Sequence, residues 1–565
     1  MKQRIAVLIG LAAASSLCLA DPGTPADSGF VPLTGTFYVN TNLYNVANNT
    51  EHPGLDIAAN GNVVFGWEND GDAITDFESV WTVYDPSGNP LTPQTVQTNR
   101  DISGNGACGT DYLATTNNYL SFFRSDNTPI GGYTGWGGYW PKANRFGNGF
   151  GATAMCWEIG LEIPELMDVN TAAQADDFPV VQLLNNDGSP LRPGVISGLT
   201  NLGILTFTVA DNTPAGKIRG GDLDYLANGN IVTTGQSQQN DDWLLTGQTN
   251  GHVPVYRIWT PGGLPVHGYA AVSSEAIGGD LYRGVGVTAN GFALRWGQDG
   301  VGSTIRFFNN AGVPTSADIS LTNLTGHPEV AAGGDGAGCG FHGNGVDAYV
   351  YANTGGTPNT PWVTVINADG TLRWSRQVQD DSDPIDNSAS GDVDAAIDQY
   401  GRVVVTFTSS LPTVADPNVS HRYIQARLFD KNGAPLGPRF VVSEYENPSN
   451  PDAAYDSDSP RVAWRGNKVA FCWRGGDAPT VIAEGYQSYQ VLASRFFAAP
   501  LMLTSASHSG TTTTLAWTGG VPPYSIQRKS PLTGSWSTVK SGISGTSTTY
   551  TDSATAAYYR VQSSN

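Results

Sequence analysis

The chain has 565 residues, and its 50 Asp and Glu outnumber 29 Lys and Arg to give a formal net charge of -21. A surface this negative repels phosphate backbones and anionic lipids, so we expect no nucleic-acid partner. The 69 glycines, 34 prolines and only 4 methionines indicate turns throughout and little helical periodicity, which predicts an all-β protein.

The first twenty residues, MKQRIAVLIGLAAASSLCLA, join basic Lys2 and Arg4 to a short apolar stretch that ends in a small residue before Asp21. This pattern is typical of a secretory signal peptide. Neither this stretch nor any later segment is apolar for long enough to span a membrane. We therefore expect an exported protein, secreted or extracellular, with periplasmic and cell-surface locations both open and residues 21–29 as a linker.

A hairpin pattern recurs about seven times: an apolar strand, a turn built on Asn and Gly, and a second apolar strand. Asn-Gly pairs favour such turns because they tolerate positive φ. Six copies are followed by a strand and a turn that resembles Asp/Asn-x-x-Gly-x-Pro-Leu, and the seventh is not. The copies begin at Gly54, Gly109, Gly221, Gly284, Gly338, Gly391 and Ser459.

The strand expected after the seventh hairpin is found at the other end of the chain, where VPLTGTFYVNTN begins at Val31. In a ring of sheets the first segment can complete the last sheet and leave no open edge. A linear solenoid would need capping ends instead. The split repeat therefore predicts a seven-bladed β-propeller over residues 30–498, closed by the N-terminal strand.

Three segments carry a resemblance: VVFGW (63–67), DKNGAPLGPRFVVS (430–443) and FYVNT (37–41). They resemble the repeats of bacterial extracellular proteins, including large surface proteins and calcium-associated secreted proteins. The resemblance implies a propeller and an exported setting. It implies no particular activity, because fold alone does not settle function.

The second repeat is unusually long, since the turns near Thr116 and Asn228 are far apart. Either this blade carries an insertion or a degenerate eighth blade is hidden there. Residues 128–170 are rich in aromatics and glycine and do not read as a repeat, which favours an insertion. Cys108 and Cys156 belong to this same repeat, so we predict a disulfide between them. For Cys472, in the apolar strand VAFCW, we predict a buried free thiol.

The predicted insertion contains the strongest candidates for a binding site. Aromatic rings stack on the C–H faces of sugars, and nearby carboxylates bind hydroxyls or act in glycosidic cleavage. A loop that only packs its aromatics on the blade is the structural alternative. The binding candidates are Tyr133, Trp136, Tyr139, Trp140 and Trp157, and the weak catalytic candidates beside them are Glu158 and Glu162.

An aspartate recurs in the innermost strand of several repeats, as Asp56, Asp111, Asp224 and Asp394. These carboxylates could converge at the ring axis as an acid/base pair or a cation site. Hydrogen bonding to the backbone of a neighbouring turn is the favoured interpretation, because an active site usually breaks a repeat's symmetry. Asp224 is kept as a weak catalytic candidate, with His342 of GFHGNG as a possible base near the axis.

An acidic run, DDSDPIDNSASGDVD, begins at residue 380 and offers many oxygen ligands at short spacing, which suits Ca²⁺. It lacks the twelve-residue calcium loop, and a solvated acidic loop is the alternative. The weak metal candidates are Asp380, Asp381, Asp383 and Asp386. Calcium is the one cofactor considered.

The chain changes character near Pro500, where TTTTLAWTGG, YSIQRKS and YYRVQ alternate like strands. This tail resembles a small fibronectin type III-like sandwich over residues 499–565, with Trp517 and Tyr559 where such domains bury aromatics. The pattern stops after what would be the penultimate strand. The resemblance implies a spacer or attachment module.

These features favour a secreted propeller that binds an extracellular glycan or surface partner. The alternative is a secreted polysaccharide-degrading enzyme, a glycoside hydrolase or a polysaccharide lyase, that uses carboxylates of the insertion or of the ring axis. A role in an envelope or matrix assembly is a third possibility. Whether the chain is catalytic, and its oligomeric state, stay open from the sequence.

Overall fold

A computed structural model gives the fold. It describes residues 23–40, 49–70, 78–92, 95–98, 106–108, 112–117, 119–124, 139–147, 149–155, 179–186, 189–192, 204–206, 218–237, 254–266, 270–273, 282–298, 302–327, 341–355, 360–379, 393–412, 420–443, 458–475, 492–552 and 557–563. No helix among these described residues is long and apolar enough to cross a membrane.

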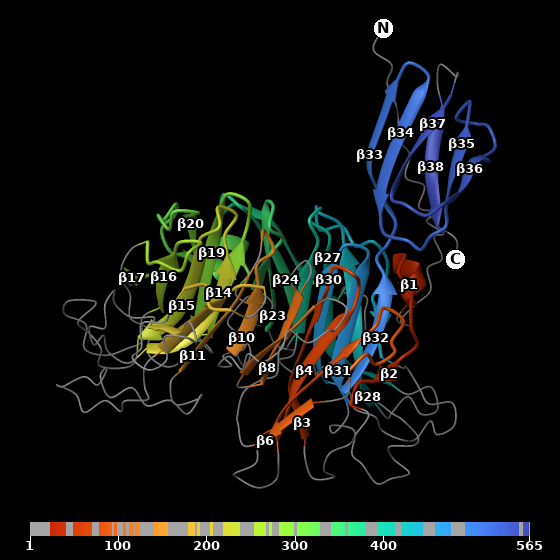
Figure 1. Ribbon diagram of the computed structural model, residues 1–565. Coiled ribbons are helices and arrows are strands. Elements are labelled where there is room, and N and C mark those ends of the chain that lie inside the picture. The colour runs from red at the N-terminus through yellow and green to blue at the C-terminus, as the bar shows by residue number, and fades with distance from the viewer. Residues whose placement is uncertain are drawn as a thin grey trace, which may run out of the picture.

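Eight small antiparallel sheets follow one another through the described part of the larger domain (Figure 1). The first four consist of β3 (Asn49–Ile57), β4 (Val63–Asp70), β5 (Glu78–Tyr84) and β6 (Thr95–Thr98); β7 (Gly106–Cys108), β8 (Tyr112–Asn117) and β9 (Tyr119–Arg124); β10 (Tyr139–Ala143), β11 (Phe150–Met155), β12 (Pro179–Leu184) and β13 (Ile204–Thr206); and β14 (Ile218–Tyr225), β15 (Ile231–Ser237), β16 (Pro254–Trp259) and β17 (Ala270–Ala271).

The remaining four follow, and the last of them takes strands from both ends of the domain. They consist of β18 (Tyr282–Val287), β19 (Gly291–Gln298), β20 (Gly302–Asn309) and β21 (Ile319–Ser320); β22 (Phe341–Gly343), β23 (Ala348–Gly355), β24 (Thr360–Asn367) and β25 (Leu372–Gln377); β26 (Val393–Ile397), β27 (Val403–Pro412), β28 (Ser420–Phe429) and β29 (Phe440–Val441); and β30 (Asp458–Arg465), β31 (Lys468–Arg474) and β32 (Leu492–Ala498) with β1 (Val31–Pro32) and β2 (Phe37–Tyr38). Two short helices are η1 (Pro25–Ser28) and α1 (Leu321–Thr325).

The sheets close into a ring. The first strand of each sheet contacts the first strand of the next, from β3 through β7, β10, β14, β18, β22 and β26 to β30, and β30 contacts β3. Middle strands such as β16 are buried along their whole length because sheets pack on both of their faces. This is the architecture of a β-propeller, as the sequence predicted.

The N-terminal segment completes the last sheet. Val31 pairs with Ala498, and Phe37 pairs with Ser494, so β1 and β2 both lie along β32. The Phe37 ring also contacts that of Phe496, at 5.0 Å between centroids. The closure predicted from the split repeat is therefore confirmed.

The predicted blade count and insertion need correction. Seven blades were predicted, and the described residues of the ring form eight sheets. Part of the predicted insertion, residues 128–170, forms β10 and β11, which belong to a separate sheet. The hairpin escaped the pattern because its turn is one residue longer. Asn144 N–H bonds to Gly149, whereas Ala58 N–H bonds to Asn62 in the first sheet.

A repeated arginine joins neighbouring sheets. Arg306, Arg427 and Arg495 lie on the third strand of their sheets and donate to backbone carbonyls just after the fourth strand of the preceding sheet. The acceptors are the carbonyls of Val272, Val378 (2.8 Å) and Val442 (3.2 Å), respectively. We call these contacts the arginine latches.

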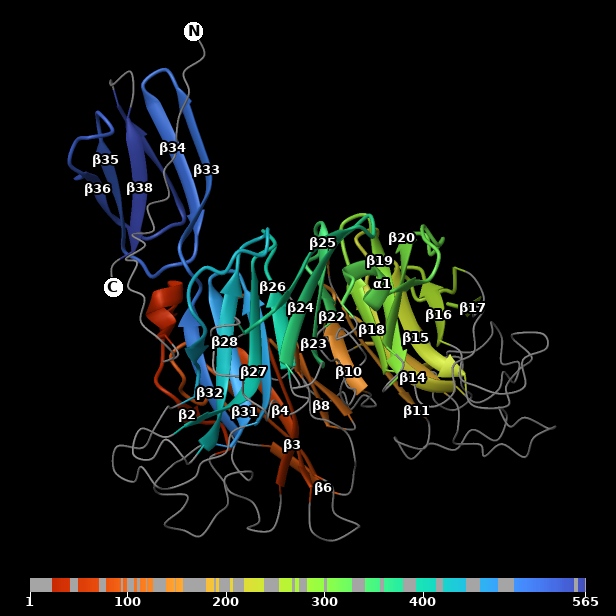
Figure 2. The ribbon, with the colours of Figure 1, turned by 180° about the vertical axis from the view of Figure 1, so that it is seen from behind.

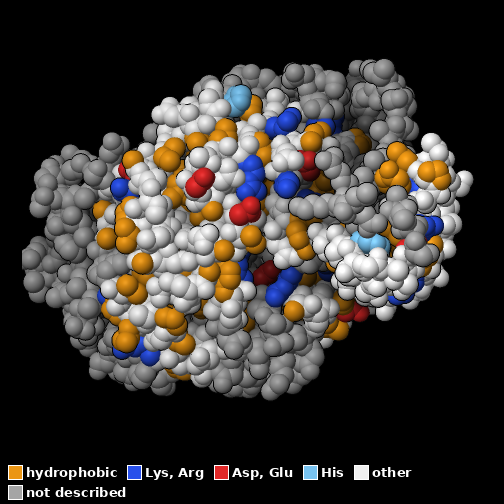
Figure 3. Space-filling model, turned by 90° about the horizontal axis from the view of Figure 1, so that it is seen from above, with side chains coloured by type: hydrophobic (Ala, Val, Ile, Leu, Met, Phe, Trp, Pro, Cys, Tyr) orange, Lys and Arg blue, Asp and Glu red, His pale blue; other side chains and the backbone are white. Residues whose placement is uncertain are grey.

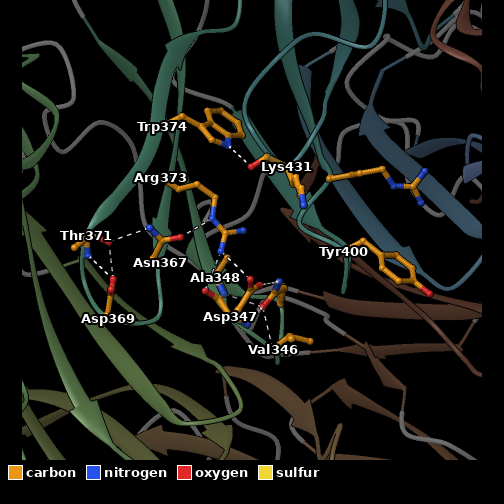
Figure 4. Close-up of polar contacts among 12 residues, drawn as sticks. Val346, Asp347, Ala348, Asn367, Asp369, Thr371, Arg373, Trp374, Tyr400 and Lys431 are labelled. Atoms are coloured by element: carbon orange, nitrogen blue, oxygen red, sulfur yellow. Dashed lines mark hydrogen bonds and ion pairs between the residues drawn. The ribbon is translucent and has the colours of Figure 1, made fainter. Parts of the chain in front are cut away.

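The turns on one face of the ring are held by polar side chains, as Figure 4 shows for the sixth and seventh sheets. Arg373 donates to Asn367 Oδ1 (2.6 Å) and to Asp347 Oδ2 (2.9 Å), which joins the two turns of the sixth sheet. Trp374 Nε1 donates to the carbonyl of Lys431 (3.1 Å) in a turn of the seventh. These hydrogen bonds link neighbouring turns on this face of the ring.

The tail forms two three-stranded sheets on the side of the ring where these turns lie (Figure 1). One contains β33 (Met502–Ser509), β34 (Thr512–Thr518) and β37 (Ser547–Thr551), and the other contains β36 (Ser537–Ile543), β35 (Tyr524–Lys529) and β38 (Tyr558–Ser563). Trp517 and Tyr559 are buried in their shared core. Asn467 Nδ2 donates to the carbonyl of Gly520 (2.7 Å), which ties the tail to the ring.

Candidate functional site

The innermost strands gather charged side chains around the ring axis, a region that we call the hub. The sequence GDLDY in β14 alternates, so Asp222 and Asp224 share one side of the strand while Leu223 enters the core on the other. Both aspartates are buried, at 7% and 3% exposed.

Two cations from the third sheet pair with these aspartates. Lys142 Nζ lies 3.6 Å from Asp222 Oδ1, and Arg145 Nη2 lies 3.5 Å from Asp224 Oδ2. Burial raises the pKa of Asp224, although Arg145 and Lys142 oppose this rise. Burial lowers the pKa of Lys142, but the negative charges of Asp222 and Asp224 outweigh it and leave this pKa above its ordinary value. The hub thus holds opposite charges in near contact.

Arg145 also reaches across the hub. Its Nη1 donates to the carbonyl of Gly343 (2.7 Å), which joins the third sheet to the sixth. Gly345 has φ of 74°, and a Cβ there would lie 3.3 Å from Arg145 Cδ, so a glycine leaves room for this contact. Figure 3 shows this face from above, with Lys or Arg and Asp or Glu side chains in a hollow near its middle.

Two hub carboxylates serve the fold. Asp222 Oδ2 accepts the N–H of Val285 (3.1 Å), and Asp394 Oδ2 accepts the N–H of Val462 (3.0 Å). Each donor belongs to the first strand of the next sheet. These aspartates therefore accept hydrogen bonds from backbone N–H groups, as the favoured interpretation of the repeat predicted. The donors lie on a strand of the next sheet, whereas a neighbouring turn was predicted.

His342 lies on β22, and its side chain is 34% exposed. Its Nε2 is 3.7 Å from Asp394 Oδ1 of the seventh sheet. The structure thus brings two sequence candidates, Asp224 and His342, to the same hub, with Arg145 in contact with the first and with the residue after the second. Sequence reasoning missed Arg145, because its contact partners lie 79 and 198 residues further along the chain.

Most other candidates cannot be placed. Tyr139 and Trp140 lie in β10 and Cys108 lies in β7, but their side chains are outside the description. Cys472 is buried and free, as predicted. Among the described residues, no group of three or more His, Cys, Asp or Glu could hold a metal ion. The predicted residues outside the described part of the chain are Asp111, Tyr133, Trp136, Cys156, Trp157, Glu158, Glu162, Asp380, Asp381, Asp383 and Asp386.

No protein-family model and no curated protein matches the chain. Among solved structures it is similar to Sqt1 from Chaetomium thermophilum, with a TM-score of 0.41 and 11% identity over 80% of this chain and 97% of that one. It is also similar to the polysaccharide lyase Uly1 (TM-score 0.39, 8% identity, 83% and 97% covered) and to an α-L-arabinanase from Penicillium chrysogenum (0.33, 9%, 83% and 96%). Similarity this low carries no argument about function.

Proposed function

We propose that the chain is a secreted propeller protein that binds an extracellular glycan or surface partner at the hub. The observation that carries this proposal is the close alternation of donors and acceptors there. The side chains of Arg145 and His342 are 40% and 34% exposed beside the buried carboxylates of Asp224 and Asp394. A sugar hydroxyl both donates and accepts, so fixed partners of both kinds suit a hydroxyl-rich ligand.

Binding fits the described hub better than catalysis does. Glycosidic cleavage needs one carboxyl group to give a proton and a second carboxylate that reaches the sugar or a water. Asp222 and Asp394 are instead held by backbone N–H groups of the next sheet. A polysaccharide-degrading enzyme is the alternative function, and its candidate catalytic residues are Glu158 and Glu162 of the predicted insertion and Asp224 and His342 of the hub.

The remaining parts of the proposal concern the two ends of the chain. Residues 1–20 are proposed to be a signal peptide, and the repeats are proposed to belong with those of bacterial extracellular proteins. The tail is proposed to be a fibronectin type III-like spacer. Its strand order, β33-β34-β37 against β36-β35-β38, supports this assignment.

A panel of immobilised neutral glycans tests the hub. The protein without residues 1–20 should bind at least one member, and Arg145→Ala should weaken that binding about tenfold, as expected for loss of one charge-assisted hydrogen bond. Lys431→Gln removes a charge from an exposed turn away from the hub and should have no effect. Unchanged binding by both Arg145→Ala and His342→Ala would place the site elsewhere.

The enzyme alternative has its own test. The same glycans are incubated with the protein and examined for new reducing ends or unsaturated products. Product formation that is lost in Glu158→Gln, Glu162→Gln, Asp224→Asn or His342→Ala would replace the binding proposal with a catalytic one.

A further inference from the structure

A separate cavity lies between the sixth and seventh sheets, away from the innermost strands. Its volume is ≈ 270 Å³. It is bordered by β24 and the outermost strand, β25, of the sixth sheet, by β28 of the seventh, and by His327, two residues after the end of α1. Figure 2 shows these elements. We call it the outer cavity. Its lining residues are His327, Trp362, Ser375, Arg376, Gln377, Gln379, Arg427, Phe429 and Pro435.

The charge of the outer cavity is opposite to that of the chain. Its lining includes Arg376 and Arg427 and no Asp or Glu among the described residues, although the whole chain carries a net charge of -21. Arg376 is exposed at the end of β25. Arg427 is buried, and its Nη1 donates to the carbonyl of Val378 (2.8 Å). A cavity of this kind attracts an anionic group.

Two buried donors in the lining lack an acceptor. Trp362 Nε1 and Gln379 Nε2 are inaccessible and make no hydrogen bond within the described structure. The two side chains are 9% and 4% exposed. Buried polar groups are nearly always hydrogen-bonded, so each unpaired donor points to an acceptor that comes from outside the described chain.

A third feature of the lining is aromatic. The imidazole of His327 lies on the indole of Trp362, with 4.6 Å between ring centroids and 40° between planes. The N–H of His327 bonds to Thr325 Oγ1 (3.2 Å), which holds this residue at the end of α1. Phe429 adds another ring to the lining. Flat rings beside a guanidinium suit a ligand with both C–H faces and an anionic oxygen.

We propose that the outer cavity binds the carboxylate of a uronic acid residue in an acidic glycan. Arg376 pairs with the carboxylate in a bidentate manner, and a shift of the surrounding side chains on binding opens the donors of Trp362 and Gln379 to oxygens of the sugar. The volume lies just below the range of roughly 300–1,000 Å³ for drug-sized ligands, which suits a single sugar ring. The proposal concerns a second site and a different ligand charge from those of the hub.

Calorimetric titration with a galacturonic acid oligomer and with an uncharged galactose oligomer of the same length tests this proposal. The acidic oligomer should bind, more weakly as salt is added, and the neutral oligomer should not bind at this site. Arg376→Gln should weaken binding of the acidic oligomer about tenfold. Lys431→Gln removes the same charge from a turn outside the cavity and should leave binding unchanged.

A second variant tests the buried donor. Trp362→Phe keeps an aromatic ring and removes the indole N–H, so it should lower the affinity severalfold while the unfolding temperature shows that the fold is retained. Absence of acidic-oligomer binding, or an affinity unchanged from the parent protein in both Arg376→Gln and Trp362→Phe, overturns the proposal. Equal binding of an oligoglutamate peptide would overturn the assignment to a sugar. Arg145→Ala should not affect this binding, so the proposals for the hub and for the outer cavity are tested independently of each other.

Discussion

Lys468 is a buried cation in the seam between the last and first sheets. The residue is 7% exposed. Its Nζ donates to the carbonyl of Gly61 (2.7 Å) and lies 3.8 Å from the centroid of the Phe496 ring. Burial lowers its pKa from 10.5 to about 7, although the nearby charge of Asp85 opposes this. Below the folded pKa of about 7 the fold therefore carries the full cost of burying a charge.

This cost predicts the pH dependence of stability. The unfolded chain keeps the Lys468 proton up to about pH 10.5, whereas the folded chain loses it above about pH 7. The contribution of this residue to the free energy of unfolding is therefore largest above pH 10.5 and falls as the pH is lowered to about 7. Lys468→Met removes this dependence. Its unfolding temperature should rise relative to the parent protein as pH is lowered from 10 to 6, with exposed Lys431→Met as the control. A difference that is constant with pH would contradict this assignment.

At this scale the sequence predicts some residues and misses others. Asp224 and Asp394 could be assigned to the innermost strands because they sit at one fixed position in a repeat. Arg145 and Trp362 could not be assigned a role, because their surroundings depend on which sheets meet across the hub or side by side. Local pattern identifies the strand that a residue occupies, and it does not identify the partner that a distant sheet supplies.

Single strands show how the sheets are joined. Each arginine latch places a guanidinium on a carbonyl of the preceding sheet, and in two cases the guanidinium also lies over the aromatic ring two residues later: Arg427 over Phe429 at 5.9 Å and Arg495 over Phe497 at 5.0 Å. The sequences ARLF and SRFF carry this spacing. Comparing the third strands alone would have revealed the arginine, but its acceptor carbonyl leaves no mark in the sequence.

Removal of one latch should weaken one seam of the ring. Arg427→Met keeps much of the packing volume and leaves the buried carbonyl of Val378 without this donor. We expect the free energy of unfolding to fall by about 2 kcal/mol, as for loss of a hydrogen bond to a charged group. Chemical denaturation measures the change, with exposed Arg376→Met as the matched control. Equal stability of the two variants would show that the latch contributes little.

The turn of one hairpin explains why the third sheet, β10 to β13, was not predicted from the sequence. β10 and β11 form a hairpin like the others, but their turn, Asn144 to Gly149, is one residue longer than the turn of the first sheet and has its Asn-Gly pair at its end, at residues 148–149. Aromatic residues around it also resembled a loop built for binding. A pattern search with fixed turn length therefore merged two sheets into one long blade.

The ring as a whole depends on its closing strands. Phe496 and Phe497 of β32 are fully buried, and β1 and β2 cover the edge of that strand. A chain that begins at residue 49 leaves this edge open, and an open edge promotes association between molecules. We expect such a chain to aggregate and to unfold at a lower temperature, as measured by size-exclusion chromatography and thermal melting.

The matched truncation removes the other end. A chain that stops after Ala499 lacks the tail but keeps all eight sheets of the described ring, so it should remain monodisperse and melt near the parent temperature. Were both truncations equally stable, closure by β1 and β2 would not be what holds the ring together. The sequence predicted this closure because a missing strand at one end and a spare strand at the other are visible without any structure.

Pairing of Val31 with Ala498 also fixes the order of events during synthesis. The ribosome releases β1 long before β32 exists, so the two cannot meet until nearly five hundred residues have been translated. A shorter nascent chain lacks β32, so β1 and β2 have no strand to pair with and the ring stays open. Translational stalling or proteolytic cleavage before residue 492 would therefore yield a fragment with unpaired strand edges, which cellular quality control can recognise.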